Sequence, residues 1–284
     1  MKKYIVSLFT LTLFAVNAMA QCDVPSTVTA TVRLVRKPNT LLHGQFSVAS
    51  GVKVSFSQGN LQYKAGDGSA SSPEWRFAAN QWDRIGAAAG NTTESNRNVQ
   101  ANWIDLFGYG TSGNDSKYPY QASTTVGDYA SGDIAGTNYD WGKKIFTEGV
   151  DVGYRVLTSA EWAYILNSRG ANLHFLATVH SVPGLVLLPD GWSSIGVSYT
   201  VTVTSYTTNN ISDADWTLLE NAGAVFLPAA GQRSGTTVSS VGSNGYYWSS
   251  TGAKCTDFST SGVSATTTTL NNYIGASVRL VQTL

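Results

Sequence analysis

Charged residues are scarce in this chain. Lysine and arginine together number 18, aspartate and glutamate also number 18, and charged residues fill only 13% of the 284 positions, about half of the usual share of roughly 25%. No stripe of basic residues offers a track for a phosphate backbone, which argues against nucleic-acid binding. Cysteine occurs only twice, and two cysteines cannot form a tetrahedral zinc site without other ligands.

Long apolar segments are also lacking after residue 20, which argues against a transmembrane helix. Residues 1–20 have the three parts of a secretory signal: a positive start at Lys2 and Lys3, an apolar stretch over 4–16, and small residues before a cleavage point after Ala20. The apolar stretch is shorter than the ~20 residues that a membrane span needs. We therefore predict an exported protein, located in the periplasm, on the outer surface or outside the cell. Cleavage of this signal would remove Lys2 and Lys3 and leave 16 basic against 18 acidic residues in the mature chain.

The two cysteines are Cys22 and Cys255. In an oxidising compartment they could form a disulfide that ties the amino-terminal segment to the carboxyl-terminal region, or they could remain free thiols. Lipidation of Cys22 is disfavoured, because Gln21 stands where a small residue is expected. The sequence leaves these alternatives open.

Aromatic and small polar residues are abundant, with eight Trp, fourteen Tyr, ten Phe and 28 Gly. The aromatic residues supply enough apolar area for a buried core, so the chain is not disordered. After a polar lead-in at 21–43, period-two alternation over 46–56 around Ser50-Gly51 predicts a β-hairpin. Further extended segments are predicted at 61–63, 75–82, 184–188, 224–227, 246–250 and 277–281. The segment 75–82 includes Trp82, and a turn at 182–184 precedes the segment 184–188. His174 and His180 are predicted to lie on one further strand.

Two helices are predicted from their capping residues. Thr158 and Glu161 form a capping box, and Gly170 ends the first helix. The same pattern recurs at Ser212 and Asp215, with an end at Gly223. The hydrophobic staples pair Leu157 with Trp162 and Ile211 with Trp216, and we expect both tryptophans to lie in the core together with the two Leu-Pro strands.

These elements predict an α+β fold with mainly antiparallel strands, two short helices and long loops, in one domain at 44–284. Residues 86–142 are rich in Gly, Asn, Ser, Asp and Tyr. A loop region of this length is usually functional or packed by its own side chains. We expect it to lie outside the core, as we do the segment 251–275.

Several separated motifs carry a family resemblance. Residues 154–162 (Tyr-Arg-Val-Leu-Thr-Ser-Ala-Glu-Trp), 245–250 and 276–281 resemble the formylglycine-generating-enzyme branch of C-type lectin-like folds. Residues 56–63, 133–142 and 226–231 resemble exported Bacteroidota proteins of the Fibrobacter succinogenes major paralogous type. The resemblance covers roughly 44–284 and implies a C-type lectin-like fold, but it does not settle a function.

The catalytic chemistry of that branch is not supported by the residues present. Oxidation of a substrate cysteine needs a pair of thiols near the carboxyl end, where this chain has only Cys255. Related iron enzymes use clustered histidines, and His174 and His180, on one predicted strand, would lie about 20 Å apart. The third histidine is His43. The sugar-binding triplets of C-type lectins are absent, because Trp248 is followed by two serines.

Asp128, Asp133 and Asp140 are close in sequence. We interpret them first as turn-forming residues, and a structural calcium ion or a hydrolytic carboxylate pair remain the alternatives. Asp213 and Asp215 are explained by helix capping. We therefore predict no catalytic residues and no cofactor, apart from calcium as that alternative.

The sequence favours a non-catalytic binding protein with a protein or glycan ligand at the cell surface. Its carboxyl-terminal region combines rigid aromatic rings with small polar groups, a composition that suits recognition. The predicted ligand-binding residues are Tyr246, Thr251, Lys254, Asp257, Asn271, Asn272 and Tyr273. Two alternatives remain. One, which the resemblance implies, is a variable protein of a diversity-generating retroelement with a hypermutable patch at 251–275, and the other is a structural surface-assembly protein.

Overall fold

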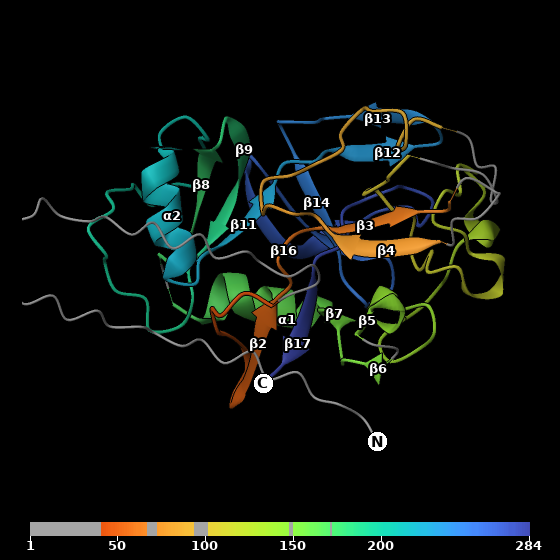
Figure 1. Cartoon of the computed structure of the whole chain (residues 1–284), viewed down its shortest axis with the longest axis horizontal. Coiled ribbons are helices and arrows are strands. Elements are labelled where there is room, and N and C mark those ends of the chain that lie inside the picture. Colours follow the sequence, from red (N-terminus) through yellow and green to blue (C-terminus); the bar gives the residue numbers. More distant parts are fainter. Residues whose placement is uncertain (1–40, 67–72, 94–101, 148–149, 171) are drawn as a thin grey trace, which may run out of the picture. The chain divides into compact units, whose positions relative to one another are not determined.

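The structure is a computed structural model that describes residues 41–66, 73–93, 102–147, 150–170 and 172–284. The predicted signal at 1–20, Cys22 and most of the lead-in at 21–43 lie outside the described residues. Figure 1 shows the arrangement of the helices and strands.

The amino-terminal hairpin and the end of the chain share one antiparallel sheet. Its first two strands turn at Ser50 and Gly51, as predicted, and Gly51 has the positive φ of 74° that glycine adopts without strain. The last strand, β17, pairs with both β2 and β7. In order across the sheet the strands are β1 (Phe46–Ala49), β2 (Val52–Phe56), β17 (Leu280–Thr283) and β7 (Arg155–Val156).

Helix α1 (Ser159–Ala163) begins at the predicted capping box. The Thr158 hydroxyl accepts the Glu161 N–H at 3.2 Å, and the Glu161 carboxylate accepts the Thr158 N–H at 2.8 Å. The helix continues into one wider turn, η4 (Tyr164–Ser168), and the chain then leaves the helical path at Gly170, where φ is 125°.

Helix α2 (Asp213–Asn221) begins at the predicted cap. The Ser212 hydroxyl accepts the Asp215 N–H at 3.1 Å and donates to the Asp215 carboxylate at 2.8 Å. The helix ends before Gly223, where φ is 95°. The staple tryptophans of the two helices are buried, which confirms their predicted place in the core: Trp162 and Trp216.

The two Leu-Pro strands lie next to each other, antiparallel, in a second sheet. The predicted turn at 182–184 is wrong, because β9 already begins at Val182. The chain turns instead at His180 and Ser181, which have positive φ values of 47° and 63°, as a two-residue hairpin turn requires. His180 is therefore in a turn and not on the strand predicted for it. The strand order is β10 (Asn210–Ile211), β8 (His174–Val179), β9 (Val182–Leu187) and β11 (Val225–Pro228).

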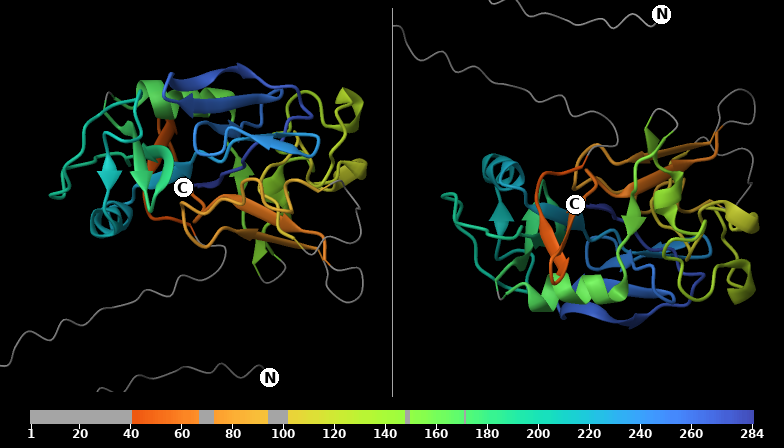
Figure 2. Two further views of the ribbon diagram at one scale, coloured as in Figure 1. Left: turned by 90° about the horizontal axis from the view of Figure 1, so that it is seen from above. Right: turned by 90° about the horizontal axis from the view of Figure 1, so that it is seen from below.

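The carboxyl-terminal region forms a third sheet that packs against α1, and both views in Figure 2 show the helix beside these strands. Its strands are β14 (Gly245–Trp248), β15 (Lys254–Ser259) and β16 (Gly262–Thr269). Three two-stranded hairpins complete the fold: β3 (Leu61–Lys64) with β4 (Glu74–Phe77), β5 (Phe146–Thr147) with β6 (Val150–Asp151), and β12 (Gln232–Ser234) with β13 (Thr237–Ser239).

One residue of the predicted extended segment at 75–82 lies elsewhere. Trp82 is in a turn after β4, not on a strand. The Asn80 N–H donates to the Asp83 carboxylate at 2.8 Å, and this local bond reverses the chain.

The core of the described residues, which fall within the unit Lys37–Leu284, divides into three clusters. The first lies under α1 and includes Trp162, and the third lies under α2 and includes Trp216. The second contains Trp141 and Trp248. The architecture is thus mixed α+β, with mostly antiparallel strands and two short helices, as predicted.

The expectation that residues 86–142 lie outside the core is wrong for many of them. Large apolar and aromatic side chains of this region are buried, among them Ile104, Leu106, Phe107, Tyr109, Tyr120, Tyr129, Ile134 and Trp141. The helical turns in its described residues are short: η1 (Asn114–Ser116), η2 (Val126–Asp128) and η3 (Trp141–Lys144). The loops are therefore packed by their own aromatic rings. Among the described residues, no helix is both long enough and apolar enough to cross a bilayer.

Candidate ligand-binding site

The predicted ligand-binding residues fall into three groups rather than one surface. Tyr246 on β14 and Asp257 on β15 are cross-strand neighbours, and Asp257 is in turn opposite Ser264 on β16. Tyr246 and Asp257 are half-buried. Burial, followed by the nearby Asp257 carboxylate, raises the pKa of the Tyr246 hydroxyl.

A second group lies at the turn between β14 and β15. The Thr251 hydroxyl accepts the N–H of Ser159 at 3.2 Å, so it helps to anchor the first turn of α1. The Lys254 carbonyl accepts the Ser249 hydroxyl at 2.8 Å. Both predicted residues are half-buried. The carbonyl of Lys254 stabilises the turn, and the hydroxyl of Thr251 ties the turn to α1.

The third group is the loop before β17, and here one prediction is wrong. Asn272 is only 7% exposed. Its side-chain amide donates to the carbonyls of Val126 and Ala130, both at 3.0 Å, so it is a buried tether and not a surface contact. Asn271 is exposed and donates to the hydroxyl of half-buried Tyr273 at 2.9 Å.

The wider expectation that 251–275 lies outside is also wrong in part. Strand β15 contributes Phe258 to the first core cluster and Cys255 to the second. Among the residues of this segment whose burial is described, those that are buried are Cys255, Thr256, Phe258, Ala265, Asn272 and Gly275. A hypermutable patch over the whole interval would therefore change core positions.

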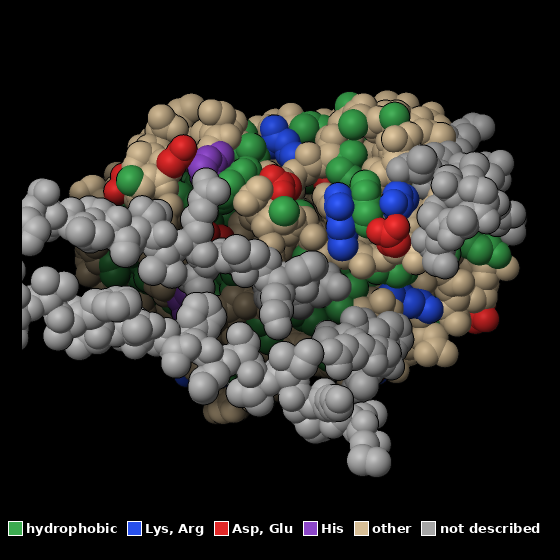
Figure 3. Space-filling view, viewed as in Figure 1, with side chains coloured by type: hydrophobic (Ala, Val, Ile, Leu, Met, Phe, Trp, Pro, Cys, Tyr) green, Lys and Arg blue, Asp and Glu red, His purple; other side chains and the backbone are tan. Residues whose placement is uncertain are grey.

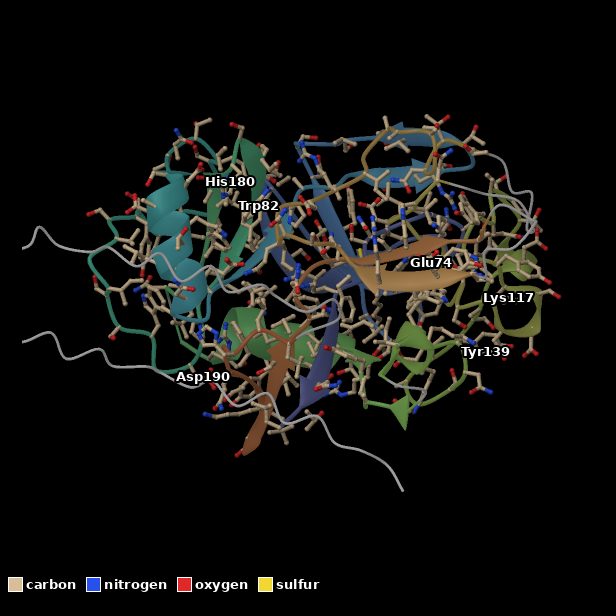
Figure 4. The ribbon with its side chains drawn as sticks, viewed as in Figure 1. Glu74, Trp82, Lys117, Tyr139, His180 and Asp190 are labelled. Carbon is tan, nitrogen blue, oxygen red and sulfur yellow. The ribbon has the colours of Figure 1, made fainter. Side chains whose placement is uncertain are left out.

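Val126 and Ala130, whose carbonyls accept hydrogen bonds from Asn272, line a pocket of about 450 Å³ in the long loop region. We call it the loop pocket. It is lined by Lys117, Val126, Gly127, Tyr129, Ala130, Ser131 and Tyr139. Figure 4 shows Lys117 and Tyr139 on this group of loops, away from α2.

Hydrogen bonds hold the walls of the loop pocket. The Lys117 ammonium donates to the carbonyl of Gly127 at 2.8 Å, which joins two sides of the pocket. The hydroxyl of buried Tyr129 points away from solvent and donates to the carbonyls of Gln121 and Ser123, at 3.1 and 2.5 Å. With Asn272 on Val126 and Ala130, three side chains fix the backbone around the pocket.

Tyr139 is bonded to a loop with unusual backbone geometry. Its hydroxyl donates to the Asp115 carboxylate at 2.6 Å, and this bond is the main cause that raises the pKa of Tyr139. Asp115 and Ser116 both have positive φ, 44° and 60°. Such conformations cost of order 1–3 kcal/mol each for residues other than glycine and cluster at functional sites.

The loops that form the pocket pack on buried aromatic rings. Tyr109 packs edge-on against Trp248, with ring centroids 5.2 Å apart, and against Trp141 at 6.5 Å. The Trp248 indole N–H donates to the carbonyl of Phe107 at 2.6 Å. This frame ties the loops to the carboxyl-terminal sheet.

The three aspartates considered for calcium have separate roles. Asp140 is buried, and its carboxylate accepts the N–H groups of Gly142 at 2.9 Å and Val156 at 3.2 Å; burial raises its pKa to about 6. Asp128 lies in η2, and Asp133 is exposed in a later loop. Within the described part of the chain, no three His, Cys, Asp or Glu side chains group as metal ligands.

The histidines and the cysteine are equally dispersed. His43 is exposed, while His174 is half-buried on β8. His180 stacks on Trp82, with centroids 3.7 Å apart, and its Nδ1 lies 3.0 Å from the Asp213 carboxylate. Cys255 is a buried free thiol, and burial raises its pKa.

A second, smaller pocket of about 220 Å³ lies beside β10, at the α2 end of the fold. It is lined by Ser198, Tyr199, Thr200, Thr208, Asn209, Asn210 and Ile211. None of these lining residues is charged. On the face drawn in Figure 3, Lys and Arg side chains lie in small separate groups, several of them next to acidic side chains.

No family model, curated protein or solved structure matches this chain. The sequence indicates that the 86–142 region is functional or packed by its own side chains, and it does not select Lys117, Val126, Ser131 or Tyr139 as ligand-binding residues. The Gly-Asp and Tyr-rich turns of this region were the available signal. The burial of Tyr109, for example, involves contact with Trp248, which lies more than 100 positions away.

Proposed function

We propose that the protein is an exported, non-catalytic binding protein and that the loop pocket takes its ligand. The observation that carries the proposal is the pocket itself, about 450 Å³ in volume, whose lining includes the aromatic residue Tyr139, the basic residue Lys117 and the hydroxyl residue Ser131. Pockets of roughly 300–1,000 Å³ with a few convergent polar groups are typical of small-ligand sites.

The fixed backbone of the pocket supports binding. Lys117, Tyr129 and Asn272 each hold a wall through hydrogen bonds to main-chain carbonyls. Walls that are ordered before the ligand arrives lose less conformational entropy on binding, which raises affinity. The predicted carboxyl-terminal residue Asn272 thus contributes as a positioning residue, through the backbone of Val126 and Ala130.

The C-type lectin-like fold remains part of the proposal. Three of the sequence motifs that carry the resemblance meet in space. The N–H of Ser250 donates to the carbonyl of Leu157 at 2.8 Å, and the N–H of Trp248 donates to the carbonyl of Ser277 at 3.0 Å. Motifs that are far apart in sequence and bonded to one another support a common architecture with that family.

A pair of matched variants tests the site. Val126 is 57% exposed in the loop pocket, and Leu218 is 47% exposed on α2. The full chain, with Val126→Asp, with Leu218→Asp or unchanged, is applied to arrays of glycans and cell-surface proteins. We expect Val126→Asp to abolish binding of the ligand found, and Leu218→Asp to leave it unchanged. A ligand that binds all three proteins equally contradicts the proposed site.

A further inference from the structure

The polar groups of the loop pocket offer both donors and acceptors. The Lys117 ammonium has three protons, of which the Gly127 carbonyl takes one at 2.8 Å, so two remain to donate to a ligand. The Tyr139 hydroxyl uses its proton on Asp115, which leaves its oxygen to accept. The hydroxyl of Ser131, also in the lining, can do either. A ligand that both donates and accepts, such as a polyol, matches this set.

The pocket also has an apolar part. Tyr139, which carries a phenol ring, and Val126, whose side chain is exposed, both line it. A pyranose ring presents one face of C–H groups, which packs against an aromatic ring, while its hydroxyl groups point outward at the edge. The combination of a ring, a small aliphatic side chain and mixed polar groups therefore suits a sugar residue.

The charges around the pocket select a neutral ligand. Lys117 is the one cation in the lining, and the Asp115 carboxylate is bonded to the hydroxyl of Tyr139, which also lines the pocket. The Lys117 ammonium attracts an anion and repels a cation, the Asp115 carboxylate does the reverse, and the two opposite charges therefore favour neither sign of ligand charge. A neutral ligand encounters neither repulsion.

The size of the pocket argues for a small ring rather than a protein surface. Seven residues line about 450 Å³. A stable protein interface is an extended surface that buries about 800 Å² on each partner. A concave site of about 450 Å³ is instead of the size that encloses a small ligand of one or two rings.

We infer, resting on the proposed function, that the loop pocket binds a neutral sugar residue of a glycan. Its ring packs on Tyr139 and Val126, and its hydroxyl groups bond to the Lys117 ammonium, the Tyr139 oxygen and the Ser131 hydroxyl. Asp115 positions the Tyr139 ring by its hydrogen bond.

Isothermal titration calorimetry and saturation-transfer NMR with matched sugars test this inference on the full chain. The probes are oligosaccharides of glucose, galactose and N-acetylglucosamine, with glucuronic acid, galacturonic acid and glucosamine counterparts that differ in charge at one position. We expect at least one neutral series to bind, and its charged counterparts to bind at least tenfold more weakly.

The variants separate the contacts. Tyr139→Ala is expected to weaken binding at least tenfold, while Tyr139→Phe, which keeps the ring, weakens it about threefold. Lys117→Gln is expected to weaken binding several-fold. Tyr164→Ala on η4 and Lys53→Gln on β2 are matched controls outside the pocket, and we expect them to bind like the unchanged chain. Thermal melting of each variant confirms that it is folded.

Each other outcome has a defined meaning. Tighter binding of a charged counterpart would overturn the neutral ligand class and leave the pocket as the binding site. If no sugar binds at millimolar concentration, but a protein from the array loses binding with Val126→Asp, the sugar inference fails and the proposed function stands. If a sugar binds and Tyr139→Ala, Tyr139→Phe and Lys117→Gln have no effect, both the inference and the proposed site fail.

Discussion

The carboxylate of Asp140 makes the stability of this fold depend on pH. Asp140 is 2% exposed and caps η3, immediately after Tyr139 of the loop pocket. It accepts N–H groups from Gly142 and Val156, and these bonds favour its charged form. Burial outweighs them and raises its pKa from 3.8 to about 6. We predict that Asp140→Asn removes a specific part of the pH dependence of the free energy of unfolding.

The sign and size of the Asp140 contribution to the free energy of unfolding follow from the difference between its pKa values in the folded and unfolded states. Between pH 4 and pH 6 the folded Asp140 binds a proton that the unfolded one has lost, so protonation stabilises the fold. This contribution is fully present below pH 4 and is lost as the pH rises through 6. A difference of about two pKa units at ~1.4 kcal/mol each corresponds to about 3 kcal/mol for Asp140.

Urea denaturation of both proteins at pH 4, 5, 6 and 7 measures this contribution. Other carboxyl groups titrate in the same range, but they are common to both proteins and cancel in the difference. The unchanged chain is expected to lose about 3 kcal/mol relative to Asp140→Asn between pH 4 and pH 7. A difference that is constant with pH, or that rises in favour of the unchanged chain, would refute the assignment of burial as the dominant cause.

Three further predictions concern buried side chains. Asn272→Ala removes two hydrogen bonds to the pocket walls, and we expect a loss of about 1–3 kcal/mol in urea denaturation and weaker ligand binding, with exposed Asn271→Ala as the control that changes little. Trp216→Ala opens a cavity under α2 and should cost about 3–5 kcal/mol; a loss below 1 kcal/mol would contradict its place in the core. Cys255 is buried with a raised thiol pKa, so iodoacetamide at pH 8 should label it only in denaturant, and labelling of the folded protein would contradict the burial.

The residues 86–142 supply both the buried aromatic rings that support the loops and several side chains that line the loop pocket. Tyr109 and Trp141 bury their rings against the carboxyl-terminal sheet, while Lys117 and Tyr139, from neighbouring positions, line the pocket. Because the buried rings order the loop backbone, the exposed side chains need no secondary structure to hold their positions. Long loops can therefore carry a site as fixed as one built on strands.

Some elements of this protein depend only on local signals, and these could be predicted. The capping residues Thr158 and Ser212 bond to backbone groups three positions away, and a glycine ends each helix. The hairpin at 46–56 depends on alternation and on Ser50-Gly51. In each case the interacting groups are near neighbours in the chain, so the sequence pattern contains the whole interaction.

Only the tertiary structure decided the rest. The position of Asn272, a side chain that the sequence placed at the surface, depends on carbonyls at 126 and 130. The β8–β9 turn has His180 and Ser181 where asparagine and glycine are the usual signal, because the pairing of the two flanking strands fixes its register. The pocket residues converge because rings and amides from segments more than 100 positions apart hold the loops, and such long-range contacts leave no periodic trace in the sequence.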